Sequence, residues 1–172
     1  MSEKSANEVG AVSFGARLAG SQAFSVLFRE GMSLVEETAG YLDGPGRRES
    51  KILERNAALA YATESMRLTT RLMQLASWLL LHRAVNEGEM SLAQANKEKA
   101  KVKFSTTESR DPEAVRVLPE RLRELIDRSV RLQERVRRLD TTIHAPAAAA
   151  SDGSPVERQV NLLRSVFERD RA

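Results

Sequence analysis

The sequence predicts an all-α protein, an antiparallel three-helix bundle with a long central helix and a flexible C-terminal tail. Apolar residues recur at the three- and four-residue spacing of one helix face in three separate segments. Aromatic residues make up only 5% of the chain, and the 9 glycines and 5 prolines lie almost entirely between the periodic segments. At 172 residues, the chain has the length of one domain with tails.

The first predicted helix runs from about residue 21 to residue 42. Phe24, Leu27 and Leu34 belong to its single apolar stripe. The Asp-Gly-Pro-Gly sequence at 43–46 ends this helix, because glycine suits the left-handed cap and proline cannot continue the hydrogen-bond ladder. A turn this short makes the first two helices antiparallel neighbours.

The second predicted helix, residues 50–85, is the most informative segment, because its second half is apolar on nearly every face. A helix that is apolar all round needs neighbours all round. The side that packs on the other helices is expected to hold Tyr61, Leu68, Leu72, Leu75, Ala76 and Leu79. An adjacent side carries Met66, Met73 and Leu80. The surplus side carries Trp78, Leu81 and Val85.

Two explanations of the surplus side remain open from the sequence. Residues 91–117 fold over it and enlarge the core locally, or it forms a homodimer contact or partner groove. The predicted contact residues are therefore Trp78, Leu81 and Val85, together with the polar residues Glu64, Arg67 and Arg71 of the same helix, which we expect to be exposed. The turn at 43–48 is a further candidate contact.

A short polar helix and a third long helix follow. Ser91 and Gln94 form a predicted capping box for a helix that ends near residue 102. Pro119 suits the first position of the third long helix, which runs to about Asp140. Its seam has alternating spacings of three and four residues and is interrupted only by Ser129: Leu122, Leu125, Ser129, Leu132, Val136 and Leu139.

These patterns divide the chain into a disordered N-terminus at 1–17, a helical domain at 18–140, a flexible linker at 141–155 and a tail helix at 156–172. The apolar residues of the tail helix include Leu162, Leu163, Val166 and Phe167. An isolated helix of this length is marginal in water, so we expect it to order only on docking. It is either an intramolecular lid or a recognition helix for a partner, and we favour the partner.

The sequence offers no catalytic, cofactor or metal site. It has no cysteine, and its two histidines, His82 and His144, have no partner at the spacing of a metal site. No glycine-rich phosphate loop is present, and Glu36 and Glu37 diverge by about 100° on their helix. We therefore expect a protein that is not an enzyme and that uses no cofactor.

The charge pattern does not favour nucleic acid or membrane partners. The formal net charge is +3, from 27 basic and 24 acidic residues. Arginines of the third long helix follow acids at the favourable four-residue spacing in Glu124–Arg128, Asp127–Arg131 and Glu134–Arg138, which indicates a solvated, ion-paired face. The apolar run of the central helix is too short for a membrane span, and the N-terminus lacks the apolar stretch of a secretory signal. We expect a cytoplasmic protein.

Two blocks of the sequence resemble the alphaproteobacterial regulator-of-CtrA-degradation family. The first comprises residues 18–24, 31–32, 35–39 and 41–44, and the second comprises residues 64–74 and 76–80. Shorter matches follow at 84–86, 88–90, 132–133 and 135–136. The resemblance covers about residues 18–140, and the tails do not contribute to it.

The resemblance implies a non-enzymatic adaptor that tethers substrates to the ClpXP protease in regulated, cell-cycle-dependent proteolysis. It implies a homodimer of three-helix bundles that binds the protease through a primed response-regulator adaptor. Substrates including a cell-cycle transcription factor, and a cyclic-di-GMP effector protein, are its other implied partners. The family is characterised by core and surface blocks, so it assigns no individual contact residue. A helical DNA-associated regulator and a purely structural dimerisation module are the alternatives.

Overall fold

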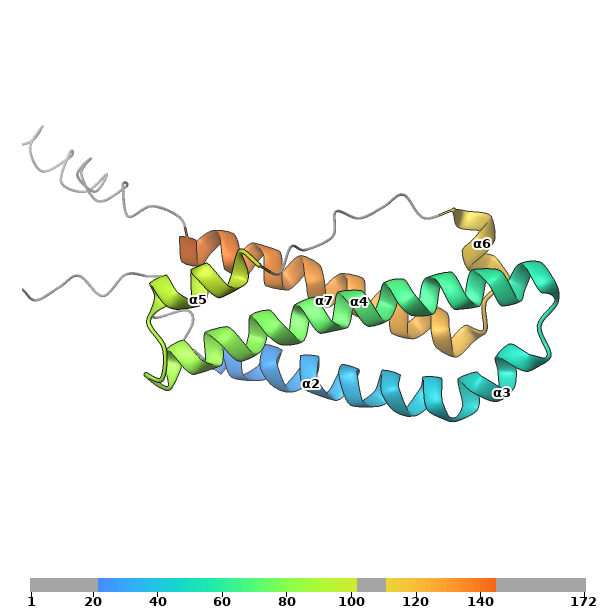
Figure 1. The fold of residues 1–172 in the computed structure, drawn as a ribbon, viewed down its shortest axis with the longest axis horizontal. Helices are drawn as coiled ribbons and strands as arrows, with labels where there is room; N and C mark the ends of the chain where they lie inside the picture. Colours follow the sequence, from blue (N-terminus) through green and yellow to red (C-terminus); the bar gives the residue numbers. More distant parts are fainter. Residues whose placement is uncertain (1–21, 102–110, 145–172) are drawn as a thin grey trace, which may run out of the picture.

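The structure, a computed structural model, describes residues 22–101 and 111–144, and all secondary structure in these ranges is helical (Figure 1). The all-α prediction is confirmed for these residues, whereas the predicted disordered N-terminus and tail helix lie outside them. The helices are α2 (Gln22–Asp43), α3 (Pro45–Lys51), α4 (Arg55–Asn86), α5 (Leu92–Lys99), α6 (Pro112–Arg116) and α7 (Glu120–His144).

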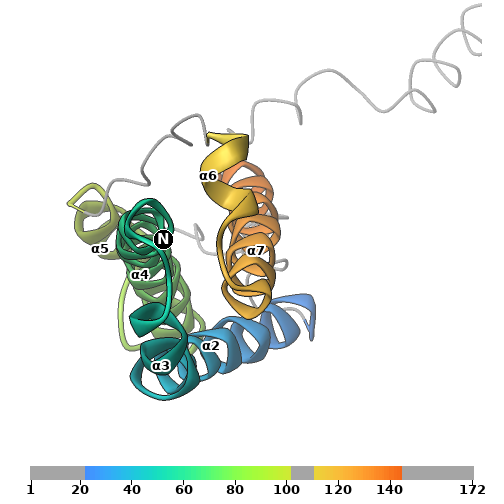
Figure 2. The same ribbon diagram turned by 90° about the vertical axis from the view of Figure 1, so that its right-hand side faces the viewer.

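The three long helices α2, α4 and α7 lie lengthwise against one another, and each contacts the other two (Figures 1 and 2). Helix α2 is antiparallel to α4, because Phe24 near its start packs on Trp78 in the second half of α4, with 6.3 Å between ring centroids. It is also antiparallel to α7, because Glu37 forms an ion pair with Arg121 and the earlier Glu30 forms one with Arg135.

Helices α4 and α7 run parallel to each other and antiparallel to α2, since at least two of any three helices that lie lengthwise together must share a direction. Arg71 bonds to Ser129, and further along both helices Trp78 bonds to Asp140. The parallel direction follows from the connection between the two helices. Helix α5 lies at the end of α4, whereas α6 lies at the opposite end of the molecule, beside the start of α7 (Figure 1). Helix α7 therefore begins at the end of the molecule at which α4 also begins (Figure 1).

The interior is a continuous apolar core built from one face of each long helix. Side chains that are 0–1% exposed include Leu34, Leu68, Leu75, Leu79, Leu122, Leu125, Ile126, Leu132 and Val136. Burying a leucine completely stabilises the fold by about 1.5–3 kcal/mol relative to leaving it exposed, so these residues dominate stability. Gly31 allows α2 to approach α4, because an added Cβ would lie 2.4 Å from Leu79 Cδ1.

The predicted start of the central helix near residue 50 is wrong. Residues Pro45–Lys51 form the separate helix α3, with Pro45 in its first turn, and α4 begins at Arg55. Gly46 packs so closely on α2 and α4 that an added Cβ would lie 2.6 Å from Tyr61 Oη. The Tyr41 hydroxyl donates a 2.7 Å hydrogen bond to Glu49 Oε2. Burial and this bond raise the pKa of Tyr41 well above its ordinary value.

The ends of α5 and α7 also refine the predictions. The capping box of Ser91 and Gln94 is confirmed, and α5 ends at Lys99. Helix α7 continues to His144, four residues into the predicted linker. Ile143 extends the core there at 8% exposed. The hydroxyl of Thr141 donates to the carbonyl of Arg137 within the same helix, which satisfies this polar side chain locally.

Candidate protein-interaction surface

An apolar row lies exposed along α4. Leu59, Met66, Met73 and Leu80 are 69%, 72%, 66% and 52% exposed. They follow one another at intervals of seven residues, so they lie on one face of the helix. Ile52, which is 85% exposed, precedes Leu59 by the same interval. Exposed apolar residues in a continuous row mark interaction surfaces more often than scattered ones do.

Small, uncharged residues fill the rest of this face. They lie three and four residues after each of the first three large apolar residues of the row, and they are Ala62, Thr63, Thr69, Thr70, Ala76 and Ser77. The hydroxyls of Thr69 and Ser77 each donate a 2.9 Å hydrogen bond to a carbonyl four residues earlier in α4. Burying these hydroxyls under a partner would therefore cost little. We call the ten residues, the four large apolar ones and these six, the α4 stripe.

One residue of the predicted surplus side of the central helix lies in the core. Trp78 is only 1% exposed and belongs to the core cluster, so it is not available as a contact residue. Helix α5 packs on α4 and buries Ala95 to 2% exposed. Of the two explanations left open by the sequence, the structure supports the locally enlarged core at Trp78. Leu81 and Val85 are half-buried, and their role as contacts stays a prediction.

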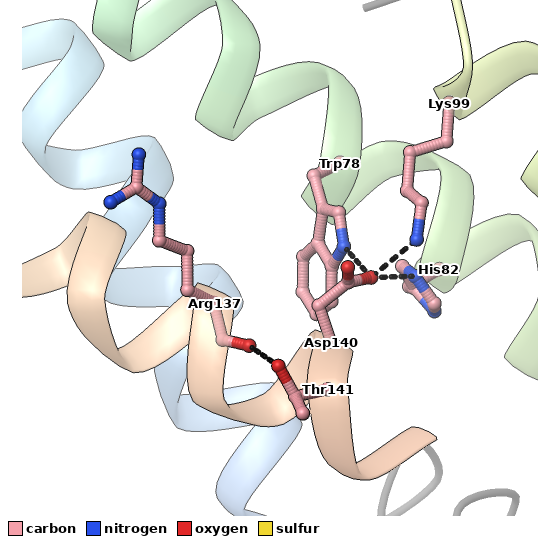
Figure 3. A network of polar contacts seen from close by, with 6 residues as sticks. All are labelled: Trp78, His82, Lys99, Arg137, Asp140 and Thr141. Atoms are coloured by element: carbon pink, nitrogen blue, oxygen red, sulfur yellow. Dashed lines mark hydrogen bonds and ion pairs between the residues drawn. The ribbon is translucent and has the colours of Figure 1, made fainter. Parts of the chain in front are cut away.

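A polar network joins α4, α5 and α7 around Trp78 (Figure 3). The Trp78 indole N–H donates to Asp140 Oδ1 at 2.8 Å, and Lys99 Nζ donates to the same oxygen at 2.6 Å. His82 Nε2 lies 4.0 Å from that oxygen, and the His82 and Trp78 ring centroids are 4.1 Å apart. His82 is 1% exposed. This network holds three helices together.

Replacing Asp140 with alanine should destabilise the fold by about 1–3 kcal/mol, because the buried Trp78 N–H would lose its acceptor. Urea unfolding followed by circular dichroism measures the change. Glu134→Ala on the same helix is the matched control, since Glu134 and its partner Arg138 have side chains 60% and 78% exposed and lie 3.9 Å apart. We expect the control to change stability by less than about 0.5 kcal/mol. Equal effects of the two substitutions would contradict a stabilising role for the network.

The three polar residues predicted as exposed contacts of α4 are mostly turned toward the helical body. Glu64 is 4% exposed, so the prediction is wrong for this residue. Arg67 donates to Glu64 Oε1 at 2.7 Å and keeps its side chain 39% exposed. Arg71 donates to the buried Ser129 hydroxyl at 3.0 Å. The Ser129 hydroxyl in turn donates to the Ile126 carbonyl at 2.7 Å, which explains how a serine is accommodated in the apolar seam.

The arginines of α7 form ion pairs both with α2 and within their own helix, where Arg138 pairs with Glu134 as predicted. Arg128 and Arg121 both pair with Glu37, and Arg135 pairs with Glu30. The predicted pair of Glu124 with Arg128 is wrong, because Glu124 instead accepts from Arg121. Arginines engaged by carboxylates in this way form a poor phosphate-binding surface.

The described residues contain no group of three or more histidine or acidic side chains arranged to hold a metal ion. Within the same ranges, no helix has the length and apolar character needed to cross a membrane. The predicted tail contacts Leu162, Leu163, Val166 and Phe167 lie outside the residues that the structure describes. The α4 stripe is therefore the main candidate surface on the helical body.

Comparison with known proteins places the chain in a family. The family model described as "Protein of unknown function (DUF1465)" matches residues 15–167. The chain belongs to this family. A solved structure, that of RcdA from Caulobacter crescentus CB15, is 53% identical to it, with a TM-score of 0.63. The match covers 77% of this chain and 99% of that chain. No curated protein matches.

The RcdA match confirms the resemblance to the regulator-of-CtrA-degradation family. The DUF1465 match extends 23 residues beyond the end of α7 at His144. The sequence common to the family therefore includes most of the predicted tail as well as the helical body.

Proposed function

We propose that this chain is a non-enzymatic adaptor that tethers substrates to the ClpXP protease for regulated, cell-cycle-dependent proteolysis in the cytoplasm. The observation that carries the proposal is the 53% identity to RcdA over 77% of the chain. An adaptor raises the local concentration of its cargo at the protease without a covalent step, so it needs binding surfaces and no catalytic group. The exposed α4 stripe is such a surface.

The proposed occupant of the α4 stripe is a second copy of the chain. From Leu59 to Leu80 the stripe is roughly 32 Å long at the rise of an α-helix, so its partner must offer an uncharged surface of similar length. Helix α4 of a second copy offers that surface. A two-fold dimer would pair the same residues on both chains, and the small side chains at 62, 69 and 76 would let the two helices approach closely.

The other proposed partners follow from family membership. They are the protease bound through a primed response-regulator adaptor, substrates including a cell-cycle transcription factor, and a cyclic-di-GMP effector protein. Pairing of the stripe in a dimer would leave α2 and α7 facing outward for these partners. A dimer also carries two copies of each such surface, which strengthens tethering through multivalency.

Co-sedimentation tests the proposed link to the protease. The full chain should sediment with the unfoldase–peptidase complex when the response regulator is present, and should stay in the supernatant when either component is omitted. Charge reversal of Arg67 and Arg71 is a poor probe, because it would place new carboxylates beside the buried Glu64 and remove the bond to Ser129. Absence of the chain from the pellet with all components present would contradict the adaptor proposal.

A further inference from the structure

A hollow of about 340 Å³ lies between the start of α2 and the end of α4. Phe24 and Phe28 of α2 form its apolar floor, with 6.3 Å between their ring centroids. Arg29 and Arg83 line it from the two helices. The hollow is separate from the α4 stripe, and the proposed function does not use it.

The chemistry of the hollow suits an apolar side chain followed by a carboxylate. The Arg83 guanidinium carbon lies 5.0 Å from the centroid of the Phe28 ring, and Arg83 Nε donates to Glu87 Oε1 at 2.8 Å. Arg29 is exposed and forms no ion pair with any residue in the described ranges. Aromatic rings bordered by guanidinium groups bind an apolar group through burial and an adjacent carboxylate through charge-assisted hydrogen bonds.

We propose that the C-terminal segment of the same chain, residues 163–170, docks in this hollow. Phe167 would pack on Phe24 and Phe28, and the carboxylates of Glu168 and Asp170 would face the two arginines. The sequence Phe-Glu-Arg-Asp at 167–170 supplies the aromatic group and both carboxylates within four positions.

The path of the chain supports this occupant. Helix α7 ends at the same end of the molecule at which α2 begins and α4 ends, and the residues that line the hollow belong to those ends of α2 and α4 (Figure 1). Phe167 follows His144 by 23 residues. A flexible segment of that length has a root-mean-square span of roughly 25 Å, enough to cross one end of the helical body.

Docking requires only a weak intrinsic affinity between the segment and the hollow, because the segment is tethered to the helical body. A short flexible tether gives an effective concentration in the millimolar range, so a docking contact with an intrinsic dissociation constant of about 1 mM would be occupied about half of the time. The family match to residue 167 includes the proposed anchor Phe167 in the sequence that the family shares. Docking would cover the apolar face of the tail and so compete with any partner that binds it. That competition, unlike the docking itself, rests on the proposed function.

Disulfide trapping in the full-length chain tests the docking. The sequence contains no cysteine, so any disulfide that forms must involve the introduced cysteines. Ser25 lines the hollow and is exposed, and Ser165 lies two residues before Phe167. We expect the pair Ser25→Cys with Ser165→Cys to form an intramolecular disulfide at least about tenfold faster than the pair Ser33→Cys with Ser165→Cys. Ser33 is an exposed serine of the same helix and is the matched control.

Adding Phe167→Ala to the Ser25 pair should abolish this rate advantage, with an unchanged circular dichroism spectrum. Equal rates for the Ser25 and Ser33 pairs, or no effect of Phe167→Ala, would overturn the proposal. Disulfides that form between chains, at a rate that rises with protein concentration, would place the tail on a second copy and would also overturn it. The trapping reaction contains no protease or substrate. A negative result would therefore contradict the docking of the tail and leave the adaptor proposal unaffected.

Discussion

Replacing Trp78 with alanine should lower the free energy of unfolding by about 3–5 kcal/mol, the largest loss that we expect from a single substitution. Trp78 is 1% exposed and packs on Phe24 of α2 and His82 of its own helix. Its indole N–H reaches Asp140 of α7. Removing the ring leaves a cavity where these helices meet, and it also leaves the Asp140–Lys99 pair without its indole donor.

Urea unfolding followed by circular dichroism measures this loss, because the chain has no other tryptophan to report by fluorescence. Val26→Ala is the control, because Val26 lies outside the proposed dimer contact. Val26 is 48% exposed, so we expect a change within about 0.5 kcal/mol. If Trp78→Ala left the unfolding energy unchanged but abolished self-association, Trp78 would be a contact residue, as the sequence pattern suggested, and its core position would be contradicted.

The double substitution Met66→Glu with Met73→Glu should convert the proposed dimer into a monomer. In a two-fold contact through the α4 stripe, the two changes would bury four unpaired carboxylates at the interface. We expect a loss of at least about 3 kcal/mol of association energy, which raises the dissociation constant more than a hundredfold. Both side chains are more than half exposed in the single chain, so the monomer should remain folded.

Multi-angle light scattering at several concentrations measures the change in mass. The double substitution Val26→Glu with Val117→Glu is the matched control, because these valines are 48% and 49% exposed and lie outside α4. The control should leave the mass unchanged. A Met66→Glu and Met73→Glu chain that retained the mass of a dimer would exclude the α4 stripe as the dimer contact.

The faces of α2 and α7 were predictable from the sequence because each carries a single apolar stripe. Leu34 of α2 and Leu122 and Val136 of α7 lie in the core as their spacing indicates. Ser129, the one polar residue of the apolar seam, is also buried, at 0% exposed. Periodicity decides burial when only one face of a helix can enter a core.

The buried face of the central helix was not predictable in the same way, because apolar residues lie on several of its faces and not all of these faces can enter the core. Its position on the helix predicts that Trp78 is surplus, yet a hydrogen-bond acceptor 62 residues away and the packing of α5 on α4 bring it into the core. The exposed face is instead the row of Met66, Met73 and Leu80, whose regular interval of seven is visible in the sequence. Contacts between segments that are distant in the sequence decide which face of α4 is buried. The spacing of apolar residues along one helix does not reveal these contacts.

The direction of α7 has a similar origin. Three amphipathic stripes are compatible with either direction of the last helix, and the choice depends on the path of the connection between α4 and α7. Helices α5 and α6 lie at opposite ends of the molecule, which makes α7 parallel to α4 (Figure 1). The arginines of α7 thereby meet Glu30 and Glu37 of α2, contacts that sequence spacing within one helix cannot reveal.

Substrate degradation by the reconstituted ClpXP protease and its response regulator tests the central claim most directly. At a substrate concentration below the KM of the protease, adding the full chain should raise the initial degradation rate at least about tenfold, because tethering raises the local substrate concentration. A substrate that the protease degrades without an adaptor serves as the control, and its rate should not change. An unchanged rate for the adaptor-dependent substrate, with the chain folded and in excess, would contradict the adaptor function.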